Sequence, residues 1–255
     1  MATALITGGT SGIGAEFARQ LAARGDDLIL VARDADRLAD MATQLKDQHG
    51  VSVETIIADL AVRDEVMTVA KRLASTEQPV DMLVNNAGFG VPKTLVTDDT
   101  SAHEHAIDVM IRAVLILAGA AGKAMKARGR GQIINVSSTA GFVAMGSYSA
   151  IKAWVTTYSE ALTNELARNG VTVTALCPGY VRTEFHQRAS IRTGSIAAPM
   201  WIDLDELVTQ ALADVAKGKV ISIPTRRYQV MIFAARHFPR SAVRAVSRRM
   251  SSKRH

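Results

Sequence analysis

A tyrosine and a lysine four residues apart, Tyr148 and Lys152, are the side chains of this 255-residue chain best suited to move a proton. The segment around them predicts a helix beginning near Ser147, and residues four apart lie on one face of a helix. A free tyrosine has a pKa near ~10, so a neighbouring ammonium group is needed to bring that pKa towards neutral pH. We therefore expect Tyr148 to act as a general acid or base, with Lys152 supplying a permanent positive charge.

Two serines precede this pair. Ser137 and Ser138 follow Asn135 and Val136, and Ser138 lies 10 residues before Tyr148. A serine hydroxyl can hydrogen-bond the oxygen of a reacting carbonyl or alcohol. Both serines are candidates for this role on their residue type alone.

A glycine-rich segment, Thr7 to Gly14, separates a strand-like run from the first predicted helix. Exposed N–H groups and the helix dipole at a helix start favour a phosphate. Glycine also permits the close backbone approach that a pyrophosphate requires. The segment therefore indicates a dinucleotide site, and the alternative is a tight turn without a ligand.

Short apolar runs alternate with longer amphipathic segments, and this alternation predicts parallel strands joined by helical crossovers. Seven runs qualify as strands: Thr3 to Thr7, Asp27 to Ala32, Val51 to Ala58, Met82 to Asn85, Gln132 to Ser137, Val171 to Cys177 and Val220 to Ile223. We expect one α/β domain of the Rossmann type, with a doubly wound, seven-stranded parallel sheet and helices on both faces. Ligands bind such sheets at the carboxyl ends of the strands.

Further motifs fall at these predicted strand ends. The sequence Asn85-Asn86-Ala87-Gly88 closes the fourth strand, and Pro178-Gly179 follows the sixth. With the TGxxxGxG turn and the YxxxK pair, these motifs resemble the short-chain dehydrogenase/reductase family over roughly residues 3 to 185. The resemblance implies hydride transfer between a nicotinamide cofactor and a carbonyl or alcohol. It favours Ser138 over Ser137, so the implied catalytic residues are Ser138, Tyr148 and Lys152.

The resemblance also implies a set of cofactor-binding residues at the strand ends. Asp59 and Leu60 would border the adenine, Asn86 to Gly88 would support the adenosine side, and Thr183 would meet the nicotinamide carboxamide. The full implied set is Gly8, Thr10, Ser11, Gly12, Ile13, Gly14, Arg33, Asp59, Leu60, Asn86, Ala87, Gly88, Tyr148, Lys152, Pro178, Gly179, Val181 and Thr183.

The end of the second strand bears on the choice of cofactor. NAD-preferring relatives usually place an acidic residue where this chain has Ala32, to hold the ribose 2′-hydroxyl. Arg33 instead offers a planar, charged group suited to a 2′-phosphate, so we expect NADP(H) to be preferred over NAD(H). The alternative is that Arg33 is a solvated surface charge, because the glycine turn lacks the second basic residue of many NADP-dependent relatives and Asp34 adds a negative charge.

Met110 departs from the family pattern. Relatives carry an asparagine there that takes part in a water relay to the lysine, and a methionine has no amide to hold that water. The proton path is then rebuilt from other groups such as Asn86, or turnover is slow, or the reaction is lost. The second function class is accordingly a catalytically weakened dinucleotide-binding sensor or scaffold. The short spacing between Ser138 and Tyr148 is expected to reshape the substrate mouth.

We expect a fairly apolar substrate, a ketone or a 3-oxoacyl compound by family resemblance. Residues 180–204 would form a lid over the substrate pocket. The candidate pocket residues are Phe89, Phe142, Met145, Tyr180, Phe185, Met200 and Trp201. Relatives commonly form homodimers or homotetramers, through helices that correspond to residues 99–128 and 147–169 here.

The basic charge is concentrated in the C-terminal extension, residues 226–255, which follows the domain of residues 1–225. The extension contains nine Lys and Arg residues and no Asp or Glu, whereas the remainder has 21 basic and 24 acidic residues. We therefore expect no nucleic-acid site on the body. The extension is interpreted as a packed helix or partner surface, with a peripheral membrane or other anionic partner as the alternative.

Other features favour a cytoplasmic protein. A single cysteine cannot form an intramolecular disulfide, and the N-terminus lacks the pattern of a signal peptide. Because Arg112 and Lys123 bound the apolar run from Ala113 to Ala121, we expect no membrane-spanning stretch of the required ~18 to 20 residues. The histidines lack the spacing of metal ligands, so no metal is expected.

Overall fold

A seven-stranded parallel sheet forms the centre of the computed structural model, which describes residues 2–185 and 196–252. The strand order is β3-β2-β1-β4-β5-β6-β9. The strands are β1 (Thr3–Thr7), β2 (Asp27–Ala32), β3 (Val53–Ile57), β4 (Met82–Asn85), β5 (Gly131–Val136), β6 (Val171–Leu176) and β9 (Ile221–Ser222). This order is doubly wound, with the winding direction reversing between β1 and β4. The predicted Rossmann-type fold is therefore confirmed.

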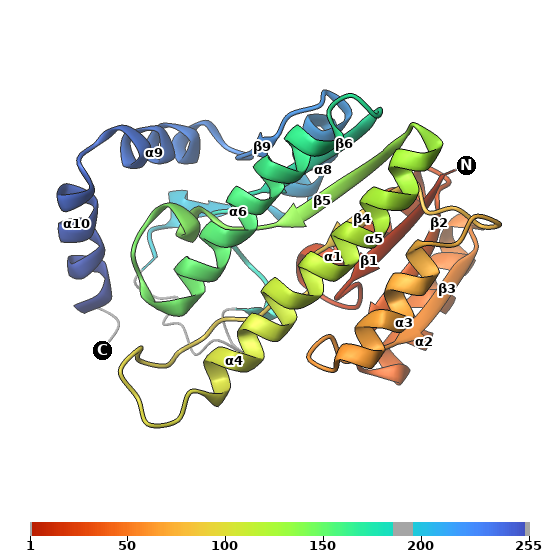
Figure 1. Ribbon diagram of the computed structural model, residues 1–255, viewed down its shortest axis with the longest axis horizontal. Coiled ribbons are helices and arrows are strands. Elements are labelled where there is room, and N and C mark those ends of the chain that lie inside the picture. The colour runs from red at the N-terminus through yellow and green to blue at the C-terminus, as the bar shows by residue number, and fades with distance from the viewer. Residues whose placement is uncertain (1, 186–195, 253–255) are drawn as a thin grey trace.

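Helices cover both faces of the sheet (Figure 1). On one face lie α1 (Gly12–Ala23), α2 (Ala35–His49) and α8 (Leu204–Ala216). On the other face lie α3 (Arg63–Leu73), α5 (Ala113–Arg128) and α6 (Gly146–Leu166). Each face of the sheet is thus buried, which explains why the central strands are apolar along their whole length.

The long helix on the second face contains an irregular turn. Helix α4 (Ser101–Ile107) continues through a π-helical turn (Asp108–Arg112) directly into α5. By length and composition the whole stretch of residues 101–128 would suffice to cross a membrane, so the expectation that no stretch was long enough is wrong. Half of its most apolar window is buried within the protein, as in the core helix of a soluble fold.

Between β6 and α8, the chain forms a second, two-stranded parallel sheet. It pairs β7 (Tyr180–Val181) with β8 (Trp201–Ile202), and a short 3-10 helix (Ala198–Met200) precedes β8. This pairing holds together the two ends of the segment predicted as a lid. Residues 186–195 of that segment lie outside the described residues.

The C-terminal extension forms two helices, α9 (Arg226–His237) and α10 (Arg240–Ser252). Figure 1 shows both on the side of the molecule opposite β2 and β3. Helix α9 packs against the 3-10 helix Thr139–Phe142, which precedes α6. Residues 253–255 lie outside the described part of the chain.

Candidate active site

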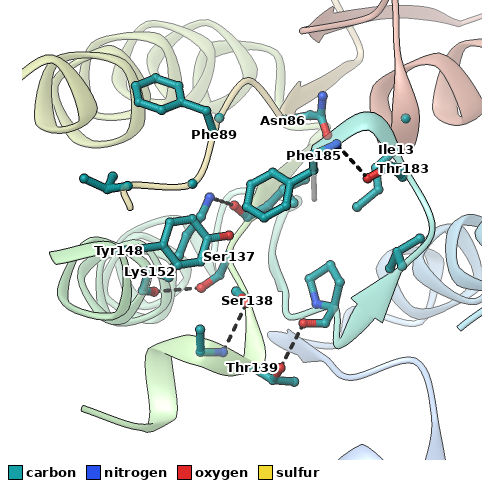
Figure 2. Close-up of a pocket in the computed structure, with 18 of the residues that line it drawn as sticks. Ile13, Asn86, Phe89, Ser137, Ser138, Thr139, Tyr148, Lys152, Thr183 and Phe185 are labelled. Atoms are coloured by element: carbon teal, nitrogen blue, oxygen red, sulfur yellow. Dashed lines mark hydrogen bonds between the residues drawn. The ribbon is translucent and has the colours of Figure 1, made fainter. Parts of the chain in front are cut away.

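A cavity of about 1760 Å³ extends along the carboxyl ends of the strands. Every residue implied by the family resemblance lines it except Gly14. The structure therefore gathers the glycine turn, the NNAG segment, the YxxxK pair and the Pro178-Gly179 segment around one space, part of which Figure 2 shows.

The NNAG segment, residues 85–88, is hydrogen-bonded to the glycine turn. The side-chain amide of Asn86 donates to the carbonyl oxygens of Thr7 and Gly8, at 2.9 and 3.2 Å. The hydroxyl oxygen of Thr7 accepts from the backbone N–H groups of Asn86 and Ala87, each at 3.0 Å. A Cβ atom at Gly14 would collide with the carbonyl oxygen of Gly8 and the Asn86 amide. Gly14 is thus required for packing beneath the turn.

The turn fits a pyrophosphate in the way its residue types indicate. Gly8 and Gly12 have positive φ angles of 66° and 52°, which glycine adopts without strain. Helix α1 begins at Gly12, and the side chain of its N-cap Ser11 accepts no capping hydrogen bond, so the first N–H groups of the helix remain available. An anion placed at this helix start would meet both the N–H groups and the helix dipole.

Two arginines line the cavity beside the carboxyl end of β2. Arg33 is two-thirds exposed, and its Nη1 is 3.7 Å from the Asp59 carboxylate. Arg37 donates to the carbonyl oxygen of Thr10 at 3.2 Å and forms an ion pair with Glu184 at 3.2 Å. Sequence reasoning missed Arg37 and therefore found no second basic residue near the turn.

The position of Arg37 follows from how α2 begins. Asp34 caps this helix, and its carboxylate accepts from the Arg37 backbone N–H at 3.1 Å. Arg37 therefore occupies the first turn of a helix that starts directly after Arg33. Asp34, whose negative charge argued against a phosphate site in the sequence analysis, thus serves as the N-cap of α2. An N-cap residue can be recognised from sequence, and it would have placed Arg37 in the first turn of the helix.

At the other end of the cavity, Tyr148 and Lys152 share one face of α6. The Nζ of Lys152 is 5.7 Å from the centre of the Tyr148 ring and donates to the Val136 carbonyl oxygen at 2.7 Å. The Ser138 hydroxyl accepts from the Ala140 backbone N–H at 3.1 Å and lies near enough to Tyr148 to lower the pKa of its hydroxyl. The Ser137 hydroxyl is buried and donates to the carbonyl oxygen of Lys152 at 2.7 Å. The two serines are thus distinguished by their partners, Ser138 facing the tyrosine and Ser137 holding α6.

Burial has opposite effects on the pKa values of the pair. It raises the pKa of Tyr148 to about 12, against a smaller lowering by the hydrogen bond from Ser138. It lowers the pKa of Lys152 to about 8. In both groups the low-dielectric surroundings disfavour the charged form. Tyr148 therefore holds its proton firmly in the protein alone, which suits it to donate that proton to a developing alkoxide.

Met110 occupies the π-helical turn and is fully buried. A Cβ atom built on Gly88 would lie 3.1 Å from the Met110 sulfur and 3.6 Å from the Lys152 Nζ. The methionine thioether and the lysine ammonium therefore flank the same glycine. A thioether is only a weak acceptor, so this side of Lys152 is apolar.

The substrate end of the cavity is mainly apolar. Of the seven predicted pocket residues, five line the cavity: Phe89, Met145, Tyr180, Phe185 and Met200. Figure 2 shows the rings of Phe185 and Tyr148 close together, and their centres are 5.8 Å apart.

The prediction was wrong for Phe142 and Trp201, which do not line the cavity. Arg236 of α9 lies 5.5 Å over the Phe142 ring. Trp201 packs against Tyr180, with Arg182 lying 4.7 Å over its ring. Both aromatic rings are thus used in packing between elements.

The C-terminal extension supplies a wall of the cavity, which sequence reasoning did not foresee. Its contributing residues are Tyr228, Met231, Ile232, Ala234, Ala235, Phe238, Ala242 and Val243. Helical spacing of apolar residues in this segment was the available signal, but it did not indicate which surface they cover. Across residues 2–185 and 196–252, no group of three His, Cys, Asp or Glu side chains is placed to hold a metal.

The fold and these strand-end motifs define a dinucleotide-binding oxidoreductase. A family profile described as short chain dehydrogenase matches residues 2–193. The chain belongs to the short-chain dehydrogenase/reductase family and is an oxidoreductase that acts on CH–OH groups.

Individual relatives agree with this assignment. The chain is 42% identical over 208 residues to the "Monensin polyketide synthase putative ketoacyl reductase" of Streptomyces virginiae, covering 76% of each protein. A short-chain dehydrogenase from Sphingobium yanoikuyae, solved in complex with NADPH, is 35% identical with a TM-score of 0.84, over 92% of this chain and 94% of that one. A bulky-bulky ketone specific alcohol dehydrogenase from Comamonas testosteroni is 31% identical with a TM-score of 0.80, over 92% of each chain.

Proposed function

We propose that the protein interconverts a carbonyl and an alcohol on a bulky, apolar ketone or 3-oxoacyl substrate, using NADP(H). The observation that carries this proposal is that Tyr148 and Ser138 line the same cavity as the glycine turn, with Ser138 near enough to lower the pKa of the Tyr148 hydroxyl. The cavity thus joins a phosphate-binding end to an apolar end that contains an acid.

In the direction of reduction, the Tyr148 hydroxyl donates its proton to the substrate carbonyl oxygen, and the Ser138 hydroxyl hydrogen-bonds the same oxygen. When bound, NADPH would supply the hydride, and a cationic oxidised nicotinamide ring beside Tyr148 would favour its deprotonated form. The Lys152 ammonium adds a second positive charge near the tyrosine. In the direction of oxidation, the deprotonated tyrosine accepts the proton of the alcohol.

The preference for NADP(H) rests on Arg33 and Arg37. Both line the adenosine end of the cavity, and Ala32 carries no charge to repel a 2′-phosphate. An arginine pair can bind a phosphate through several charge-assisted hydrogen bonds. The NADPH bound to the relative from Sphingobium yanoikuyae supports the same choice. The glycine turn and the Asn86 to Gly88 segment would hold the remainder of the cofactor.

The apolar walls supply the substrate preference. Phe185, Met145 and Met200, together with apolar side chains from α9 and α10, line the cavity and give it an apolar wall. The names of two relatives, a ketoacyl reductase and an alcohol dehydrogenase specific for bulky-bulky ketones, fit a bulky carbonyl compound.

Met110 favours a second candidate, a dinucleotide-binding sensor or scaffold with weak catalysis. Its buried thioether flanks Gly88 together with the Lys152 ammonium group, at a position where the family usually has an asparagine. A sensor would bind NADPH tightly without turning over ketones.

Consumption of NADPH, followed by its absorbance over a panel of aliphatic, aromatic and acyl-thioester ketones, tests both candidates. Tyr148→Phe removes the proton donor, and Tyr158→Phe is a matched control because its hydroxyl lies outside the cavity, 3.4 Å from the Leu115 carbonyl oxygen. We expect turnover to be lost in the first variant alone. Tight NADPH binding without turnover on any ketone would instead favour the sensor.

We also propose a cytoplasmic homodimer or homotetramer built on α5 and α6. A groove of about 460 Å³ runs between these helices, and Leu115 at its edge is 48% exposed. A second copy would bury this apolar surface. Light scattering would give the assembly, and Leu115→Glu is expected to reduce its mass to that of a monomer.

A further inference from the structure

Helices α9 and α10 have two different faces. The inner face packs on the body of the protein through the buried residues Tyr228, Ile232, Val243 and Ser247. The Ser247 hydroxyl accepts from the Ala144 backbone N–H at 3.1 Å and so attaches α10 to the loop before α6. The extension is therefore a fixed part of the fold, and its outer face has a defined direction.

The outer face exposes large apolar side chains. Val230, Met231, Phe233 and Phe238 are 69%, 48%, 64% and 62% exposed, and all four lie within nine residues of chain. Single exposed apolar residues are normal on a soluble protein, but a cluster of this kind marks a binding surface.

The extension is also basic. It contains nine Lys and Arg residues and no acidic residue. Arg226, Arg227, Arg244 and Arg248 are exposed. Arg236 instead anchors α9 to the body, through an ion pair with Glu160 of α6 at 3.5 Å. The exposed surface of α9 and α10 thus combines aromatic and aliphatic side chains with positive charge.

This face also borders an entrance to the cavity. Met231 and Phe238 both line the cavity and are largely exposed at the surface. The cavity that Tyr148 lines therefore reaches the surface beside apolar side chains of the extension. A substrate dissolved in lipid would enter the cavity there.

We propose that the outer face of α9 and α10 rests on the surface of an anionic lipid bilayer, with this cavity entrance at the lipid. The charge pattern is complementary to anionic headgroups, and the apolar side chains are of the kind that insert at the headgroup boundary. A nucleic acid would match the charge but leave the apolar cluster in water. The proposal extends the proposed function, but its test does not depend on turnover.

Flotation with lipid vesicles is the first test. The full chain is expected to float with phosphatidylcholine vesicles that contain phosphatidylglycerol, and not with phosphatidylcholine alone. Arg244→Ala with Arg248→Ala should lower the partition coefficient roughly 30-fold, since each basic residue near an anionic surface contributes about 1 kcal/mol. The matched control, Lys46→Ala with Lys71→Ala, removes two exposed lysines from α2 and α3 and should change it little.

The apolar part of the surface is tested separately. Val230→Ser with Phe233→Ser should lower the partition coefficient by at least about 10-fold. The control Ile57→Ser with Met67→Ser removes apolar side chains of similar exposure from the opposite side of the molecule. None of these four residues lines the cavity, and far-UV circular dichroism with thermal unfolding checks that each variant is folded.

A spin label reports the depth of insertion. Cys177 is the chain's single cysteine and is buried, so Phe233→Cys can be labelled selectively. With anionic vesicles the label should become accessible to oxygen and protected from a water-soluble nickel complex, whereas a label at Met67→Cys should not. Absence of flotation with anionic vesicles would overturn the proposal, as would equal losses in the controls. A concentration-dependent dimer abolished by Val230→Ser with Phe233→Ser, without lipid binding, would assign the surface to a second copy instead.

Discussion

The hydroxyl of Tyr228 accepts a hydrogen bond from the backbone N–H of Tyr180 at 3.1 Å. The same hydroxyl donates to the carbonyl oxygen of Met200 at 2.8 Å. Tyr180 and Met200 lie at the two ends of the lid segment, and Tyr228 belongs to α9. One side chain of the C-terminal extension therefore fastens both ends of the lid.

Tyr228→Phe should loosen the lid while keeping the ring in place. Each neutral hydrogen bond contributes about 1 kcal/mol, so loss of both should raise the KM for a bulky ketone on the order of 10-fold. The kcat for that ketone should change less, because Tyr148 and Ser138 are untouched. Steady-state kinetics would show the split, with Tyr158→Phe as the control. An unchanged KM would mean that the pairing of β7 with β8 is sufficient to hold the lid segment in position.

Arg33→Ala should weaken NADPH specifically. A hydrogen bond to a charged group contributes about 1.5–3 kcal/mol, so the KM for NADPH should rise about 10- to 100-fold while that for NADH changes little. Arg37→Ala should also raise the KM for NADPH. Because Arg37 forms an ion pair with Glu184 of the lid segment, this variant should loosen the lid as well. Lys46→Ala is the matched control. Equal losses for NADPH and NADH would argue against a 2′-phosphate contact.

Lys152→Met should alter how stability depends on pH. Burial depresses the Lys152 pKa to about 8 from 10.5, so in the wild type the folded state disfavours the charged form. This cost is fully present below pH ~8 and disappears as pH rises through ~10.5, where the unfolded state also loses its proton. The variant should therefore gain stability relative to wild type near neutral pH, by on the order of 1–3 kcal/mol.

Urea unfolding of the protein without cofactor would measure this effect. The difference between variant and wild type should narrow between pH ~8 and ~10.5. Loss of the hydrogen bond to Val136 shifts the stability of the variant by the same amount at every pH. The change of the stability difference with pH, rather than its size, therefore reports the ionisation of Lys152. A stability difference that did not change with pH would show that folding does not lower the pKa of Lys152.

Met110→Asn should raise turnover. An amide beside Lys152 can hold water and supply a proton path that the thioether cannot. We expect kcat to rise severalfold with little change in the KM for NADPH, and the solvent isotope effect on kcat to fall. Met110→Leu is the control for the change in packing at this buried position. If both variants are equally slow, proton supply does not limit the rate.

Much of the fold could be predicted because its strands are continuous apolar runs that end in turn residues. Six of the seven predicted strands, such as Thr3–Thr7, match within one residue at each end. The strands β7, β8 and β9 have only two residues each. Their pairing depends on neighbours distant in sequence, so β7 and β8 escaped prediction and β9 is shorter than expected.

The candidate site divides in the same way. The residues predicted to bind the cofactor lie in local motifs at strand ends, where backbone geometry demands particular residue types such as Gly14. The residues of the substrate end depend on tertiary packing. Phe142 and Trp201 are aromatic residues of the kind that line apolar pockets. In the fold, however, Phe142 packs against Arg236 and Trp201 packs against Tyr180. Arg37 was overlooked because its role depends on where α2 begins.

The wall that α9 and α10 contribute to the cavity lies beyond residue 193, where the match to the family profile ends. Changes after residue 193 can therefore alter which substrates the enzyme accepts. They leave Tyr148 and the predicted cofactor-binding residues unchanged. Two proteins that agree closely up to that residue can therefore have diverged in specificity. Substrates should be transferred between such relatives only after their C-terminal helices have been compared.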